Sequence, residues 1–317
     1  MTQYGYSLMC ELYHPNDLLA QAVRAEQAGF DFLTISDLFH PWLYSHHHSP
    51  YAWSLLGALA ARTSSVELVS LTTCPTIRYH PAIVAQKAAT VAAMTGGRFH
   101  LGVGPGENLN EHVVGSDWPP ASIRQVMLAE AIEIMRGLWS GAFTSHHGKY
   151  FTVEDARIFT LPDEPPPVHV AVSSSESVFL AAQAGDGMVA TQLLPELTQA
   201  FDRATGNGKP KYGQVAVAVG DDEARSRRLA HKLFRFSVPG WKVISELPNP
   251  VNFEAATDNV REEDVAAMVS CGPDPDRHAR AIRRWTEAGF DRVAIVQVGE
   301  PERFFDMWQR ELRPGLD

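Results

Sequence analysis

Four times along the chain, a stretch with helical spacing of apolar residues runs through a glycine-containing turn into a short apolar run. The turns contain Gly29, Gly96 with Gly97, Gly185 and Gly289. We expect each helix to end there with glycine in the left-handed conformation, which other residues rarely adopt. A helix, a glycine turn and a buried strand in this order form the repeating unit of an α/β protein.

Eight apolar runs are expected to form strands. They lack the polar alternation of a sheet with one wet face, which favours a parallel sheet covered by helices. Eight such strands predict a closed (β/α)8 TIM barrel. The strand runs are 4–8, 32–36, 66–72, 99–103, 168–172, 188–191, 214–219 and 293–297, and helices are expected at 16–28, 81–94, 274–288 and 301–312.

Two stretches exceed this minimal plan. Residues 143–154 alternate around His147 and Gly148 and predict a short hairpin before the fifth strand. Residues 238–272, which contain several prolines, predict a helical insertion before the last barrel helix. Insertions that follow barrel strands border the active-site face, so we expect this one to act as a lid or a substrate wall. No linker divides the chain, and residues 1–317 are expected to form one domain.

Composition and charge narrow the function. The net charge of −10 argues against a general affinity for nucleic acid, because neutralising phosphates needs clustered Lys and Arg. No apolar run is long enough to span a membrane, and the first residues lack the features of a secretory leader, so we expect a cytoplasmic protein. Cys10, Cys74 and Cys271 fit neither a disulfide framework nor a zinc site, and are expected to be buried thiols. His46–His48 are expected in a solvated loop, not on a metal.

In a barrel enzyme, the chemistry is carried by residues that directly follow the strands. The loops after strands two to six are polar or rich in glycine, as such a site requires. They comprise residues 36–42, 72–76, 104–111, 173–175 and 191–192.

Matching motifs lie at these strand ends and at two later turns, namely in segments 36–42, 74–82, 102–107, 184–187, 271–274 and 288–291. In order and spacing they resemble the luciferase-like flavin and deazaflavin oxidoreductases, and most closely the branch related to the F420-dependent glucose-6-phosphate dehydrogenases. The resemblance covers nearly the whole chain. It implies a barrel that binds coenzyme F420, acts on a small-molecule substrate and forms a homodimer.

The resemblance also implies roles for single residues. Asp37 would meet the polar edge of the deazaflavin, Trp42 would pack over its reacting face, and Glu107 would lie near N1 of the ring. Leu71 and Thr72 match a site where the family often has a non-proline cis peptide behind the ring. The cofactor-binding set implied by the resemblance is completed by Cys74, Gly106, Val172, Ser173, Ser174, Ser175 and Thr191.

The serine loop supports a phosphate site from its residues alone. Ser173, Ser174 and Ser175 offer hydroxyls and backbone N–H groups just before a helix that is expected to start near Ser177. The positive end of a helix attracts anions. An ordinary N-cap cluster is the alternative interpretation. Glu176 beside the loop would repel a phosphate unless its carboxylate points to solvent.

The chain departs from its relatives at the position of the catalytic base. Leu38 stands where many relatives have the histidine that is proposed to take the alcohol proton. Leucine cannot accept a proton, so either His40 reaches the substrate or the chain does not oxidise an alcohol in the usual way. Imidazole suits proton transfer near neutrality. The alternative is that His40 only binds the loop backbone.

Further departures concern substrate and charge. The basic residues that would hold a sugar phosphate are missing, and Gln192 stands where a lysine would be needed, so glucose 6-phosphate is not the expected substrate. Glu107 has an alternative role as an ion-pair partner of Arg78 or Arg98. Trp42 has an alternative role as plain core, although an aromatic residue after proline in a long loop favours a pocket wall.

The sequence therefore predicts an F420-dependent oxidoreductase in which His40, Trp42 and Glu107 act on a small or medium organic substrate beside the 238–272 insertion. An FMN-dependent monooxygenase or reductase on the same barrel is the first alternative. A catalytically silent barrel that binds a ligand is the second, because the usual base is lost at Leu38. A metal-dependent hydrolase is disfavoured, since the first strand lacks a His-x-His motif.

Overall fold

The centre of the molecule is a closed barrel of eight parallel strands, seen in a computed structural model that describes residues 2–205 and 208–316. Each strand pairs with the next around the ring, and β11 pairs with β1 to close it. The predicted (β/α)8 barrel is therefore confirmed. Its strands are β1 (Gln3–Leu8), β2 (Phe32–Ile35), β3 (Glu67–Thr73), β4 (Phe99–Val103), β7 (Val168–Ala171), β8 (Gly187–Ala190), β9 (Lys211–Val219) and β11 (Arg292–Gln297).

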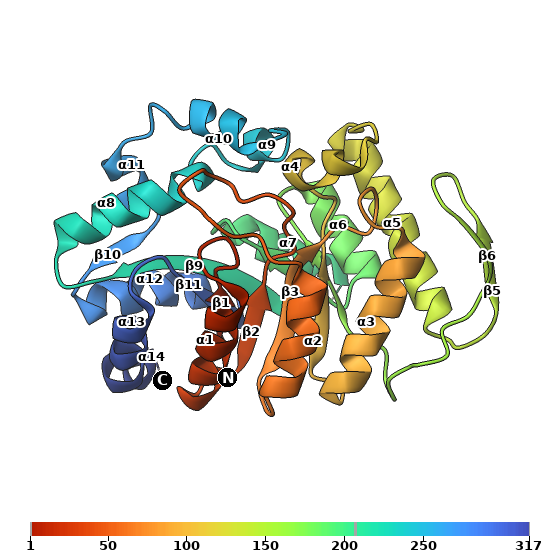
Figure 1. The fold of residues 1–317 in the computed structure, drawn as a ribbon, viewed down its shortest axis with the longest axis horizontal. Coiled ribbons are helices and arrows are strands. Elements are labelled where there is room, and N and C mark those ends of the chain that lie inside the picture. The colour runs from red at the N-terminus through yellow and green to blue at the C-terminus, as the bar shows by residue number, and fades with distance from the viewer. Residues whose placement is uncertain (1, 206–207, 317) are drawn as a thin grey trace.

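Helices cover the outside of this barrel (Figure 1). Each turns an apolar stripe inward, as in α12, where His278, Ala279, Ile282 and Trp285 are buried at helical spacing. The strands are thus enclosed on both faces, which explains their continuous apolar runs. The covering helices are α1 (Pro15–Gln27), α2 (Ala52–Arg62), α3 (Pro81–Thr95), α5 (Ala121–Leu138), α6 (Ser175–Ala184), α7 (Pro195–Thr205), α8 (Glu223–Phe234) and α12 (Pro275–Glu287).

Three of the four glycine turns have the predicted conformation. Gly29, Gly96 and Gly289 have φ values of 81°, 60° and 91°, in the left-handed region. The prediction is wrong for Gly185, which is extended with φ −89° and ψ 160°. Close packing explains this glycine instead, because a Cβ there would lie 2.8 Å from Ala181 O. Its role is to let the helix end approach the barrel, not to turn the chain left-handed.

The two stretches that do not belong to the alternating strands and helices of the barrel form a hairpin and a group of short helices. Strands β5 (Thr144–His147) and β6 (Thr152–Ala156) pair antiparallel and project from the body (Figure 1). The helices α9 (Trp241–Ile244), α10 (Pro250–Ala256) and α11 (Glu262–Ala266) occupy the second stretch. The expected boundary at 272 is wrong, because Ser270–Gly272 form a further parallel strand, β10, on the edge of β9. We refer to residues 238–269 as the insertion.

The chain ends in helical turns that pack beside α1 (Figure 1). One helix was expected at 301–312, but α13 (Pro301–Met307) passes through a π-helical turn (Trp308–Leu312) into α14 (Arg313–Leu316). Trp308 is fully buried and its ring stacks on Phe30, with 4.2 Å between centroids. In the described part of the chain, we find no helix with the length and apolar character needed to cross a membrane.

Candidate active site at the C-terminal end of the barrel

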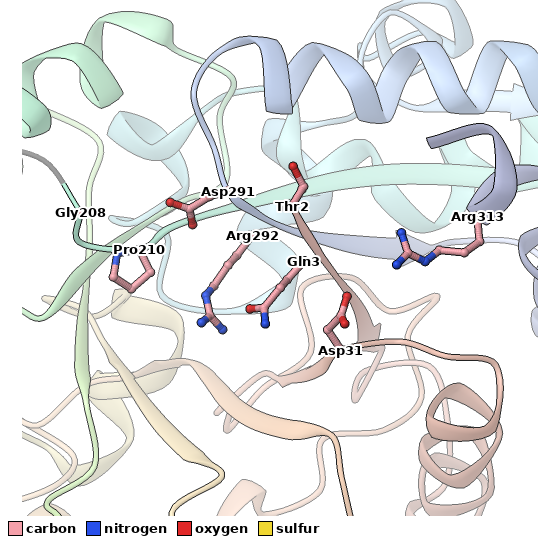
Figure 2. A pocket seen from close by; sticks show the side chains of 8 residues that line it. All are labelled: Thr2, Gln3, Asp31, Gly208, Pro210, Asp291, Arg292 and Arg313. Carbon is pink, nitrogen blue, oxygen red and sulfur yellow. The ribbon is translucent and has the colours of Figure 1, made fainter. Parts of the chain in front are cut away.

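An open pocket of about 500 Å³ lies at the wrong end of the barrel for catalysis (Figure 2). It is lined by Gln3 and Arg292, the first residues of β1 and β11, and by Asp31 just before β2. Figure 2 shows these three side chains directed into a common space. Active sites of such barrels are built from the loops at the opposite, C-terminal ends of the strands. We call these ends and their loops the barrel mouth.

Asp37 directly follows β2 at the mouth and is the centre of a hydrogen-bond network. Its side chain is fully buried. Oδ2 accepts bonds from Trp53 Nε1 at 3.0 Å and Thr73 Oγ1 at 2.9 Å. Oδ1 accepts bonds from Arg78 Nη2 at 3.0 Å and Tyr79 OH at 3.2 Å. Both carboxylate oxygens are therefore used within the chain, and the side chain organises the loops after β2 and β3.

Arg78 joins the loop after β3 to the loop after β4. Its guanidinium pairs with Asp37 and, at 3.6 Å from Nε, with Glu111, while its backbone N–H donates to Glu111 Oε2 at 2.7 Å. Burial is the largest influence on Glu111 and raises its pKa to about 7, although Arg78 acts in the opposite direction. Cys74 lies in the same layer, buried, with Sγ 3.0 Å from Thr76 Oγ1. One guanidinium thus faces two buried carboxyl groups.

The end of β3 has the backbone geometry that the resemblance implied. The peptide bond between Leu71 and Thr72 is cis, so this prediction is confirmed. Gly104 at the end of β4 lies against Thr72, since a Cβ on it would be 2.8 Å from Thr72 Oγ1. Gly106 has φ 87°, and a Cβ there would be 2.6 Å from Cys74 Sγ. The positive φ of Gly106 requires glycine there, and both glycines let the loop after β4 lie close against the end of β3.

Glu107 and His40 are brought together through Asn110. Asn110 Nδ2 donates to Glu107 Oε2 at 3.3 Å, and its Oδ1 accepts from the backbone N–H of His40 at 3.3 Å. Glu107 pairs with neither Arg78 nor Arg98 among the ion pairs of the described residues, and burial raises its pKa. His40 Nδ1 lies 3.0 Å from Leu109 O. Since a carbonyl only accepts, Nδ1 carries the proton in this bond and Nε2 is left as an acceptor.

Glu11 is a mouth residue that sequence reasoning did not select. It follows β1, its side chain is 4 % exposed, and its Oε2 has no hydrogen-bond partner. Desolvation raises its pKa to about 7. Its backbone carbonyl accepts bonds from the N–H groups of His47 and His48, each at 3.1 Å, so the loop after β2 passes directly over it. Its position could have identified it, because Glu11 closely follows the first strand and active-site residues of barrels are found directly after strands.

Trp42 lies in an apolar cluster between the loops and the insertion. Its ring stacks on Phe236 with 5.0 Å between centroids and an interplanar angle of 2°, and it meets Phe253 edge-on at 5.4 Å. Leu38 and Leu109 belong to the same cluster, which is separate from the main core. Trp42 is therefore a contact between the β2 loop and the insertion, not part of the barrel interior.

The serine loop forms a helix cap. Ser174 is the N-cap of α6, its Oγ accepts from Ser177 N at 3.3 Å, and the N–H groups of Ser173 and Ser174 both donate to Ser177 Oγ at 3.0 Å. The N-cap alternative is thus present, and α6 begins at Ser175. Glu176 lies in the first turn, where hydrogen bonds from its own N–H and from Ser174 lower its pKa. Glu176 itself is exposed to solvent.

The two remaining cofactor residues of the prediction flank β7 and β8. Val172 is buried and donates its N–H to Val189 O at 2.8 Å. Thr191 follows β8, and its Oγ1 accepts from Trp241 Nε1 of the insertion at 2.7 Å. The predicted residues therefore all lie at the mouth, Leu71 and Thr72 in the last residues of β3 and the others on loops after strands β2, β3, β4, β7 and β8.

The histidine cluster differs from expectation in one member. His46 is buried, with Nε2 2.8 Å from Leu233 O, so it is not solvated. Desolvation lowers its pKa to about 4. It holds the β2 loop against the end of α8. Across residues 2–205 and 208–316, His, Cys, Asp and Glu side chains nowhere gather in the threes or more that could hold a metal ion.

Comparison with known proteins gives matches over the full length. The family model described as luciferase-like monooxygenase matches residues 2–292. F420-dependent glucose-6-phosphate dehydrogenases from Segniliparus rotundus and Beutenbergia cavernae are each 33 % identical, over 98 % and 100 % of this chain and 97 % and 98 % of theirs. A solved F420-dependent secondary alcohol dehydrogenase with an F420–acetone adduct is 29 % identical with a TM-score of 0.93, covering 100 % of this chain and 99 % of its own.

Proposed function

Since the chain belongs to the luciferase-like monooxygenase family, we propose that it transfers a hydride between coenzyme F420 and a small uncharged organic substrate at the barrel mouth. It is an F420-dependent oxidoreductase of the luciferase-like class. The observation that carries the proposal is the full-length match to F420-dependent dehydrogenases, combined with buried carboxyl groups at the strand ends. An enzyme of this kind holds its cofactor in place and excludes water around it.

The residues at the mouth fit a bound deazaflavin. Glu11 Oε2 is a buried polar atom that the chain leaves without a partner, as expected beside a group that binds there. When bound, the coenzyme would accept or donate the hydride at C5 of its ring. We assign its ring to Thr72, Cys74, Gly106 and Glu107, and its phosphate to Ser173, Ser174 and Ser175 beside Val172 and Thr191. Asp37 holds these loops in register through its four hydrogen bonds.

An uncharged, partly apolar alcohol or ketone is the proposed substrate class. Three arginines near the mouth, Arg78, Arg124 and Arg235, are each paired with carboxylates, and Gln192 follows β8 where a cation would be needed for a sugar phosphate. When ionised, the buried carboxyl group of Glu11 and the partly buried one of Glu107 also disfavour an anion. Trp42 and the apolar cluster around it would form the wall next to the substrate.

Proton transfer is assigned to His40 and Glu11. Oxidation of an alcohol releases the hydroxyl proton as the hydride leaves carbon, so a group at the site must accept it. His40 Nε2 is left as an acceptor by the bond from Nδ1 to Leu109 O. Glu11, whose pKa is raised to about 7, is partly protonated near neutral pH, and its protonated form can donate the proton when a ketone is reduced.

Fluorescence titration tests the cofactor assignment. Purified protein should bind F420 saturably and reduce it, or oxidise its reduced form, with an alcohol or ketone. A protein that binds FMN instead, turns yellow and consumes oxygen with reduced FMN would establish the monooxygenase alternative. Binding of neither would establish a silent ligand-binding barrel.

Two variants separate the proton carriers. H40N and E11Q should each lower kcat by about 10²-fold or more, the usual contribution of a positioned acid or base. If H40N retains activity within about twofold while E11Q loses it, His40 only fastens the loop to Leu109 and the proton passes through Glu11. Circular dichroism of both variants controls for folding.

We also propose that the protein is a homodimer, that it is located in the cytoplasm, and that residues 1–317 form one domain. The outer face of α3 carries Ile83, Gln86, Thr90 and Met94, which are exposed and uncharged. Such a face on a soluble protein is typical of an interface.

The three cysteines are free, which suits a reducing compartment. Light scattering should give twice the chain mass of 34.9 kDa, and a double substitution I83E with M94E should give a monomer.

A further inference from the structure

Two consecutive residues of the insertion are fastened to the loop that carries Glu107. Ser245 and Glu246 follow α9, and both bond to Asn108, the residue after Glu107. Asn108 N donates to Ser245 O at 2.9 Å, and Asn108 Nδ2 donates to Glu246 O at 3.2 Å. The backbone at Glu107 is therefore held from the side of the insertion as well as from its own helix.

The carboxylate of Glu246 makes a second set of bonds, to the segment that leads into α5. Oε1 accepts from Arg124 Nη2 at 2.9 Å, and Oε2 accepts from Trp118 Nε1 at 2.8 Å. The Arg124 guanidinium lies 3.8 Å from the centroid of the Trp118 ring. Burial would raise the pKa of Glu246, but the bonds from Arg124 and Trp118 outweigh it and lower the pKa. The group is ionised at neutral pH.

Arg124 makes this contact more than a surface ion pair. Its side chain is 2 % exposed, whereas that of Glu246 is 48 % exposed. A buried guanidinium needs a counter-charge, and Glu246 is the carboxylate paired with it among the described residues. The latch, which we define as Asn108, Trp118, Arg124, Ser245 and Glu246, thus depends on one partly exposed carboxylate.

Arg124 also acts on Glu107 through its charge. Glu107 bonds to Asn110 on α4, the charges of Arg78 after β3 and Arg124 on α5 lower its pKa, and the charge of Asp37 after β2 raises it. Glu111 on α4 is a further carboxyl group whose pKa Glu107 itself raises. Arg78 is balanced by Asp37 and Glu111. The counter-charge of Arg124 is instead supplied by the insertion. The carboxylate of Glu246 therefore decides how much of the positive charge of Arg124 remains unbalanced near Glu107.

We propose that Glu246 is a positioning residue for Glu107, which seats the insertion on the β4–α4 loop and balances the charge of Arg124. The inference rests on the proposed function only for the role of Glu107 in the reaction. Glu246 touches neither substrate nor cofactor in this assignment. Its charge links the insertion to the protonation state of a mouth carboxyl group, and its bonds hold the loop that carries Glu107.

The test uses the full chain without cofactor. Protein labelled with ¹³C-glutamate is titrated by NMR in the wild type and in E246Q, and the Glu107 signal is identified by its loss in E107Q. E246Q removes a negative charge and leaves Arg124 unbalanced, so the Glu107 titration should move down by about one unit. W118F loosens the latch without changing charge, and the titration should stay in place.

A matched control comes from the same insertion. Glu254 on α10 pairs with Arg235 and accepts from Tyr44 N, but bonds to none of the latch residues. E254Q should leave the Glu107 titration unchanged. In steady-state assays, E246Q and W118F should both raise KM or lower kcat about tenfold through misplacement of the loop, and only E246Q should shift the pH profile.

The outcomes decide the proposal in either direction. If Glu107 titrates in E246Q at the same pH as in the wild type, the proposal is overturned. It is also overturned if E254Q shifts the Glu107 titration as much as E246Q does. If E246Q fails to fold, hydrogen exchange at residues 241–247 decides, since faster exchange in W118F supports the latch and unchanged exchange overturns it. A protein that binds no F420 would refute the proposed function and leave the titration result standing.

Discussion

Glu11 is buried at the end of β1 with one carboxylate oxygen that no donor in the chain reaches. Asp37, one strand away, accepts four hydrogen bonds. The two carboxyl groups therefore differ in their capacity to accept a hydrogen bond from a bound molecule. Asp37 is occupied in fixing the loops, whereas Glu11 remains open to a bound group. Environment, not residue type, assigns their roles.

Replacement of Glu11 by glutamine should stabilise the protein in alkali. Burial raises the pKa of Glu11 from 4.5 to about 7, so between these pH values the folded protein keeps a proton that the unfolded chain has released. The free energy of unfolding contributed by this group therefore falls as pH rises through that range. E11Q should be more stable than the wild type by about 2 kcal/mol at pH 8.5 and nearly equal to it at pH 4.5. Urea unfolding at both pH values measures this, and equal stability at pH 8.5 would contradict it.

Glu176 should weaken the binding of a phosphate-bearing cofactor. It is an acidic residue in the first turn of α6, close to the backbone N–H groups at which an anion would bind. Because the group is exposed, solvent screens its effect, and E176Q should raise F420 affinity only about two- to fivefold. Fluorescence titration measures the change. E164Q, which changes an exposed carboxylate elsewhere, is the control, and lower affinity in E176Q would count against a phosphate at this loop.

At the scale of elements, close contacts between neighbouring strands decide where glycine is required. Along β4, Gly102 faces the backbone of β3 at Ser70, and Gly104 faces Thr72. A side chain at Gly102 would overlap the Ser70 carbonyl, which cannot move without breaking the barrel. Gly104 would meet a side chain, which can rotate. The two glycines therefore differ in what their loss would do.

Alanine at Gly102 should be severely destabilising, by about 3 kcal/mol or more, because overpacking forces the backbone apart. Gly57 in α2 has no atom within 4 Å of a Cβ position, and alanine in a helix interior is favoured over glycine. G57A should therefore gain about 0.5–1 kcal/mol. Thermal unfolding of the two variants measures the contrast. A G102A protein as stable as the wild type would show that the strands can separate there.

At the scale of the whole molecule, the N-terminal end of the barrel interior is closed by a polar cluster. His100 Nδ1 lies 2.9 Å from His169 Nε2 and 3.2 Å from Tyr212 OH, and Arg292 pairs with Glu67 beside them. Desolvation lowers the pKa of His169 well below its ordinary value of 6.5 and also lowers that of His100. The cluster joins strands β3, β4, β7, β9 and β11, and stays intact only while both imidazoles are neutral.

Acid should therefore loosen the barrel from this end. Below about pH 6.5, the unfolded chain binds protons that the folded protein excludes, so the free energy of unfolding falls as pH falls, by up to about 1.4 kcal/mol per pH unit for each imidazole. H100Q combined with H169Q should flatten the slope between pH 6.5 and 5. Urea unfolding over this range measures it, and H47Q, at an exposed histidine, is the control. An unchanged slope would place the acid sensitivity elsewhere.

Much of the site could be predicted because parallel strands align their ends. Asp37, Thr72, Glu107 and Ser174 each follow an apolar run, and closure of the ring places them at one end. The prediction for Gly185 was wrong, and Glu11 was not selected, for physical reasons. The glycine is needed for an approach between α6 and β7 that local spacing does not encode, and Glu11 is distinguished only by its burial without a partner.

The order of apolar runs and glycine turns was sufficient to specify eight strands, their parallel arrangement and the end at which polar residues gather, because these depend on periodicity and chain direction alone. Three-dimensional packing decided which of those polar residues have free atoms. Both carboxylate oxygens of Asp37 accept hydrogen bonds, whereas Glu11 keeps one oxygen without a donor. The His40 ring bonds to Leu109, and Glu246 pairs with Arg124. Contacts between residues that lie 16 to 122 positions apart in the sequence set burial and charge balance, and no local pattern carries that information.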